Sequence, residues 1–118
     1  MSSPDWARPI VYMSIQAVDQ QKQREFYSQL FNWDIADEPF MFFPAGPGSP
    51  ENGISGHISS GPTPGFNVYI QVRDIHASLI RAVELGGTQV SEPFQIPGRA
   101  MIASITDPEG NALTLVQQ

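Results

Sequence analysis

The chain repeats its own order of predicted elements, and this duplication leaves few folds open to it. Residues 9–18 are rich in Val, Tyr and Ile, as in a β-strand, and Asp19 can cap a helix over residues 20–31. Residues 66–72 and Asp74 begin the same succession 55 residues later. At 118 residues, the duplication predicts one domain made of two related units.

Apolar residues after the first helix predict further strands. Trp33 and Ile35 indicate a second strand, and the apolar run over residues 40–43 indicates a third. Residues 44–65 hold 5 Pro and 6 Gly and form a loop-rich link. Residues 54–59 are one short possible strand within that link.

The second half carries clearer boundaries. An amphipathic helix is predicted over residues 75–85, and Gly86 with Gly87 ends it because glycine adopts the left-handed conformation without a steric cost. Asp107-Pro108-Glu109-Gly110 is a strong turn sequence, since proline suits its second position and glycine its fourth. Strands are predicted over residues 88–92, 99–106 and 111–117.

These elements predict an α+β fold of two tandem β-α-β-β-β units. The first unit covers about residues 9–60 and the second about residues 66–117, within one domain of residues 1–118. The apolar spacing of the two helices predicts core positions at Phe26, Leu30, Leu79 and Val83.

Composition removes several classes of function. The chain has 12 acidic and 6 basic residues, a net charge of −6 and no Lys/Arg cluster, which argues against nucleic acid or an anionic membrane as partner. It has no cysteine, so disulfides, thiolate metal sites and cysteine nucleophiles are excluded. The N-terminus lacks the pattern of a signal peptide, and no apolar run approaches the ~20 residues of a membrane span. We therefore expect a cytoplasmic protein.

Several motifs resemble one known superfamily. In the first half Val18-Asp19 precedes Phe26-Tyr27, Leu30-Phe31 and Trp33. In the second half the motifs are Val-x-Asp-Ile at 72–75, Ala-Val-Glu-Leu-Gly-Gly at 82–87 and Ile-Thr-Asp-Pro-Glu-Gly-Asn at 105–111. In this order they resemble the vicinal oxygen chelate superfamily, which includes glyoxalases, bleomycin-resistance proteins and extradiol dioxygenases.

The resemblance implies paired units whose eight strands form a curled mixed sheet around a cleft. It also implies a homodimer, as do exposed sheet edges that need covering. Metal-dependent members hold a divalent ion by four side chains, one from the first and one from the last strand of each unit. The matching positions here are Tyr12, Asn67 and Thr114, with the fourth near Gly56, beside His57. Tyr, Asn and Thr are poor ligands for such an ion, so we expect neither a metal nor another cofactor.

If the strand faces follow the superfamily, neutral hydrogen-bonding and aromatic side chains line the cleft. Such a lining suits a small organic ligand, although polar alternation also marks a solvated sheet face. His57 fits a satisfied or solvated loop histidine, or else a ligand contact or general base. The residues assigned to ligand binding are Tyr12, Ser14, Gln16, His57, Asn67, Tyr69, Gln71 and Thr114.

Three functions are compatible with these residues. The first is a metal-free, glyoxalase/bleomycin-resistance-like protein that binds a small organic molecule in the cleft and sequesters or modifies it. The alternative is a divalent-metal-dependent lyase, isomerase or dioxygenase of the same superfamily, with His57 as one ligand. The third is a dimeric interaction module without catalysis. Whether the chain is an enzyme is open, and no catalytic residue is assigned.

Overall fold

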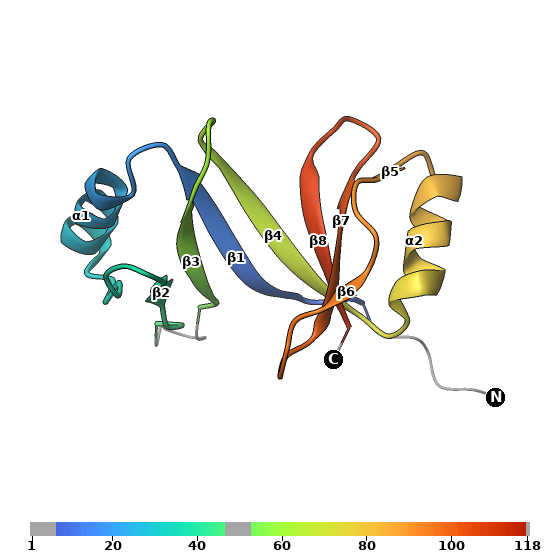
Figure 1. The fold of residues 1–118 in the computed structure, drawn as a ribbon, viewed down its shortest axis with the longest axis horizontal. Coiled ribbons are helices and arrows are strands. Elements are labelled where there is room, and N and C mark those ends of the chain that lie inside the picture. Colours follow the sequence, from blue (N-terminus) through green and yellow to red (C-terminus); the bar gives the residue numbers. More distant parts are fainter. Residues whose placement is uncertain (1–6, 47–52, 118) are drawn as a thin grey trace. The chain divides into compact units, whose positions relative to one another are not determined.

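The computed structural model describes residues 7–46 and 53–117 (Figure 1). The chain divides into two compact units. Of the described residues, 11–46 and 53–68 form the N-terminal unit, and 69–117 together with 7–10 form the C-terminal unit. No helix in the described residues is long and apolar enough to cross a membrane.

The N-terminal unit is built around three strands and one helix, and it also contains the first residues of a fourth strand, β4. β3 is its central strand, parallel to β1 and antiparallel to β2, and α1 lies against β3 (Figure 1). The Asp19 side chain accepts a hydrogen bond from the Lys22 backbone N–H at 3.1 Å, which confirms it as the cap of α1. The bounds are β1 Ile10–Ala17, α1 Gln20–Phe31, β2 Met41–Phe43 and β3 Ser55–Ser60.

The strand predicted at Trp33 and Ile35 was wrong. This segment forms no strand. The Ala36 N–H donates a hydrogen bond to the Phe42 carbonyl at 2.8 Å, which links the end of the segment to β2. Ile35 is buried and Trp33 packs against the same core. Their alternate spacing therefore reflects packing of an irregular segment rather than a sheet ladder.

β4 begins in the N-terminal unit and ends in the C-terminal unit, whose strands follow the order β4-β8-β7-β5, with β6 also paired to β7. α2 packs against β5, β7 and β8 (Figure 1). Of the strand predicted over residues 88–92, only the first two residues form a strand, β5. The sequence did not predict β6, because a strand of two residues is too short to show an alternating apolar pattern. The bounds are β4 Gly65–Val72, α2 Ile75–Glu84, β5 Thr88–Gln89, β6 Phe94–Gln95, β7 Met101–Thr106 and β8 Ala112–Gln117.

Local signals in the second half are confirmed. Asp74 caps α2 by accepting from the Ala77 N–H at 3.1 Å, the same geometry as at Asp19. Gly86 follows α2 with φ of 101°, the left-handed conformation predicted for it. The Gly110 N–H donates to the Asp107 carbonyl at 2.9 Å and closes the predicted turn. The equivalent caps support the duplication.

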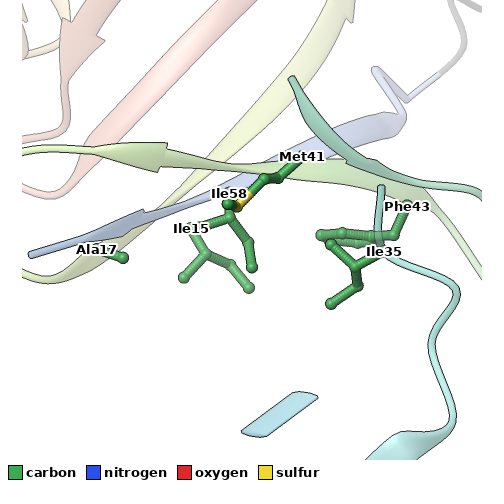
Figure 2. Close-up of a cluster of buried hydrophobic side chains, with 6 residues drawn as sticks. All are labelled: Ile15, Ala17, Ile35, Met41, Phe43 and Ile58. Atoms are coloured by element: carbon green, nitrogen blue, oxygen red, sulfur yellow. The ribbon is translucent and has the colours of Figure 1, made fainter. Parts of the chain in front are cut away.

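Each unit has its own cluster of buried side chains. Figure 2 shows the N-terminal cluster, formed by Ile15, Ala17, Ile35, Met41, Phe43 and Ile58. The C-terminal cluster is formed by Val72, Ile75, Leu79, Ala103, Ile105 and Leu115. The prediction for Leu79 is thus confirmed.

The other three predicted core positions were wrong. Phe26, Leu30 and Val83 are each more than half exposed. α1 buries no residue fully and meets the core through Tyr27. Its apolar residues extend around more of the helix than the sheet covers, so spacing alone could not select the inward face.

The predicted fold class is confirmed. The described residues form two helices and eight strands, and β1–β3 pairing is parallel while β7–β8 pairing is antiparallel, so the sheet is mixed. The first unit has one strand fewer than predicted, because residues 33–35 do not pair.

Candidate functional site

One face of the N-terminal sheet is lined by polar side chains. Along β1, Met13, Ile15 and Ala17 pack in the core, so the alternate residues lie on the opposite face. The parallel register places each of these beside a polar residue of β3. We call this surface the polar face; its pairs are Tyr12–Ser55, Ser14–His57 and Gln16–Ser59.

Tyr12 and His57 form a direct contact on the polar face. Tyr12 Oη lies 2.7 Å from His57 Nδ1, and the two ring centroids are 5.4 Å apart. β3 confirms the short strand predicted over residues 54–59, so His57 lies in a strand and not in a loop. His57 is half-buried and hydrogen-bonded, which agrees with the prediction of a satisfied histidine. Burial lowers the pKa of His57 from its usual 6.5, because the charged imidazolium loses hydration.

Two phenylalanines extend this contact into an aromatic cluster. The Phe40 ring lies 5.0 Å from the His57 ring, and Phe42 stacks on Phe40 at 6.2 Å. Phe42 pairs with His57 across β2 and β3, which fixes it on the polar face. Phe40 is 50% exposed and Phe42 is 37% exposed. We call Tyr12, His57, Phe40 and Phe42 the aromatic cluster; it combines an imidazole with exposed aromatic surface.

The two other predicted residues of β1 are held in place. Ser14 is buried beside His57. Gln16 donates from Nε2 to the Thr63 carbonyl at 2.8 Å, which ties β1 to the loop after β3. These contacts make the polar face an ordered surface.

The remaining predicted residues lie on β4 and β8. Asn67 is half-buried in the N-terminal unit, and Tyr69 and Gln71 are half-buried in the C-terminal unit. Thr114 is 3% exposed and pairs with Ser104 across β7 and β8. The sequence missed Phe40 as a site residue, because its place beside His57 depends on how β2 pairs with β3.

The chain matches a known domain family over both units. The family model described as glyoxalase-like domain matches residues 12–116. The chain belongs to the glyoxalase-like domain family. The match spans both units, so the duplicated fold and the family agree.

Two curated relatives are similar to this glyoxalase-like chain. "Putative glyoxylase CFP32" of Mycobacterium tuberculosis is 29% identical over 133 residues, covering 98% of this chain and 45% of that protein. "Anthracycline biosynthesis protein DnrV" of Streptomyces peucetius is 34% identical over 85 residues, covering 72% of this chain and 27% of that protein. The chain therefore spans less than half the length of both relatives.

Solved structures share the fold. A glyoxalase/bleomycin resistance protein/dioxygenase superfamily member from Vibrio splendidus 12B01 aligns with TM-score 0.68 and 14% identity, over 95% of this chain and 100% of that one. Methylmalonyl-CoA epimerase from Mycobacterium tuberculosis aligns with TM-score 0.61 and 20% identity, over 92% of this chain and 86% of that one. At these identities the likeness concerns the fold alone.

The residues of this glyoxalase-like chain do not fit the divalent ion that metal-dependent members of the superfamily hold. A Cβ on Gly56 would meet the Phe43 ring and the Met13 carbonyl, so position 56 faces the core, whereas His57 is the residue that contacts Tyr12. Nδ1 of His57 is already bonded to Tyr12. Within residues 7–46 and 53–117, no three His, Asp or Glu side chains are grouped so as to hold a metal.

The lowered pKa of His57 predicts a pH-dependent stability. Between pH 6.5 and the folded-state pKa, the unfolded chain binds a proton at His57 that the folded chain does not bind. The free energy of unfolding should therefore fall as the pH drops through this window, and the His57 contribution should be constant above it. An NMR titration of the ring should give a midpoint below 6.5, and H57Q should lose this part of the pH dependence. A midpoint at or above 6.5 would contradict the prediction.

Proposed function

We propose that this glyoxalase-like protein binds a small organic molecule at the polar face of its N-terminal unit, without a metal of its own. The aromatic cluster is the observation that carries the proposal. It sets a hydrogen-bonded tyrosine and histidine beside two exposed, stacked phenylalanine rings. The side chains around Tyr12 and His57 are unsuited to hold a divalent ion, which favours ligand binding by side chains alone.

The chemistry of the face favours a ligand with an aromatic ring. Aromatic rings add offset-stacking and edge contacts to the area that they bury, and a few oriented polar groups then fix the ligand's orientation. His57 is the one titratable imidazole among the pairs that β1 and β3 contribute, and its lowered pKa favours the neutral form at pH 7. A phosphate or other strongly charged group would find no fixed counter-charge at these pairs. One relative's name refers to anthracycline biosynthesis, which agrees with an aromatic ligand.

Metal analysis tests the metal-free part of the proposal. Protein purified without a histidine tag should contain far less than one divalent ion per chain. About one ion per chain, lost in H57A, would instead support the metal-dependent alternative.

Probe binding tests the ligand part. Titration with 2-naphthol, followed by backbone amide NMR shifts, should move signals of Tyr12, His57 and Phe42. F40A should weaken this binding several-fold through lost stacking. F94A is the matched control, because Phe94 is also half exposed but lies in the C-terminal unit. Equal effects of F40A and F94A would count against the polar face as the site.

A further inference from the structure

The hydrogen bond between Tyr12 and His57 determines which ring nitrogen of His57 a ligand at the polar face can contact. Resting on the binding role proposed above, we propose that Tyr12 is a positioning residue that holds His57 in the Nε2–H tautomer. His57 is then a hydrogen-bond donor, and the ligand class is an aromatic molecule that carries a carbonyl oxygen.

The direction of the hydrogen bond follows from the two groups. Tyr12 Oη and His57 Nδ1 are 2.7 Å apart, a distance that either direction of donation allows. A phenol O–H is a stronger donor than an imidazole N–H, and an unprotonated imidazole nitrogen is a stronger acceptor than a phenol oxygen. The phenol of Tyr12 therefore donates to Nδ1. A neutral imidazole that accepts at Nδ1 carries its proton on Nε2.

The surroundings of the ring keep it neutral. Among the described residues, pairing and ring contacts place Tyr12 and Ser14 from β1, Phe42 from β2 and Phe40 before it beside His57, and none of these is Asp, Glu, Lys or Arg. No carboxylate among them would stabilise an imidazolium, and burial of the ring lowers its pKa. A second proton on the ring would thus be added at a lower pH than for an ordinary histidine.

The remaining ring nitrogen is the one that a ligand can use. Nδ1 is directed to Tyr12, so Nε2 points to another side of the ring, and no residue in the described part of the chain bonds to it. The Phe40 and His57 ring centroids are 5.0 Å apart, so a ligand ring that contacts both can bring a substituent oxygen within hydrogen-bonding distance of Nε2–H. A carbonyl oxygen accepts better than a phenol oxygen, so the site should prefer the ketone.

The tautomer can be measured without any ligand. In long-range ¹H–¹⁵N spectra, the His57 ring should show a protonated Nε2 and a bare Nδ1. Y12F removes the donor but keeps the ring, and it should shift His57 to a mixture of both tautomers. S14A is the control, because it changes the neighbour of His57 without touching this bond. A bare Nε2 in the unmodified protein, or no change in Y12F, would overturn the proposal.

Three matched probes then test the ligand class. 1-Indanone, 5-indanol and indane share a ring system and differ in the group offered to His57. The protein should bind 1-indanone about two- to tenfold more tightly than indane, the worth of one hydrogen bond, and more tightly than 5-indanol. Y12F should reduce that preference for the ketone while leaving the affinity for indane unchanged.

A conservative variant separates positioning from packing. The amide N–H of glutamine can stand near the place of Nε2–H, so H57Q should keep the preference for 1-indanone and H57A should lose it. Tighter binding of 5-indanol than of 1-indanone would overturn this inference but leave the proposed binding role standing. Binding of none of the three probes would overturn both.

Discussion

Replacing Trp33 with alanine should lower the free energy of unfolding by about 2–4 kcal/mol, which is near the value for truncating a core aromatic residue. The Trp33 ring stacks on Phe43 at 4.7 Å and on Tyr27 at 5.3 Å, with interplanar angles of 22° and 10°. It thereby joins α1 to β2 and the buried cluster. Removing it would break both stacks and leave Phe43 against a cavity, whose cost adds to the lost burial.

Two variants control for this effect. W33F should recover much of the lost stability, because a phenylalanine ring can still stack between Tyr27 and Phe43. F31A should cost less than W33A, since Phe31 is more than half exposed. Urea unfolding followed by circular dichroism gives all three values without relying on tryptophan fluorescence. A W33A protein within 0.5 kcal/mol of the unmodified one would show that the stack does not hold α1.

Local chemistry explains which parts of the fold could be predicted. Asp19 and Asp74 cap helices through backbone groups three residues away, and the turn at Asp107 closes within four residues. Such signals act over short stretches of sequence, so the sequence alone contains them. By contrast, Trp33 and Ile35 alternate as apolar residues do in a strand, but they lie in an irregular segment. Whether that segment pairs with another strand depends on distant residues.

The same limit applies to the candidate site. Tyr12 and His57 were each predicted to contact a ligand, yet their contact depends on parallel pairing of strands that lie 45 residues apart. Phe40 reaches the cluster only because β2 pairs with the other side of β3. The sequence thus identifies the residue types, but which of their side chains lie next to one another depends on the register of the sheet.

The second substitution with a large expected effect on stability is at Gly56, where this register brings β3 close to β1. A Cβ at this position would clash with the carbonyl oxygen of Met13, lie 2.8 Å from the Phe43 ring and lie 2.9 Å from Cγ of Met13. The carbonyl belongs to β1, which is paired with β3, so it cannot move without disturbing the ladder that sets His57 beside Ser14. G56A should therefore cost about 1–3 kcal/mol, as overpacking of a buried site does.

Gly65 supplies the matched comparison, because it also lies in a strand but a Cβ there would have no neighbour within 4 Å. G65A should change the free energy of unfolding by less than about 0.5 kcal/mol, as surface substitutions do. G56A should in addition broaden or shift the His57 ring signals, since the strand that carries His57 must move away from β1. Equal stability of the two variants, with unchanged His57 signals in G56A, would mean that β1 and β3 can separate at this point without loss. The close approach at Gly56 would then not be what fixes Tyr12 against His57.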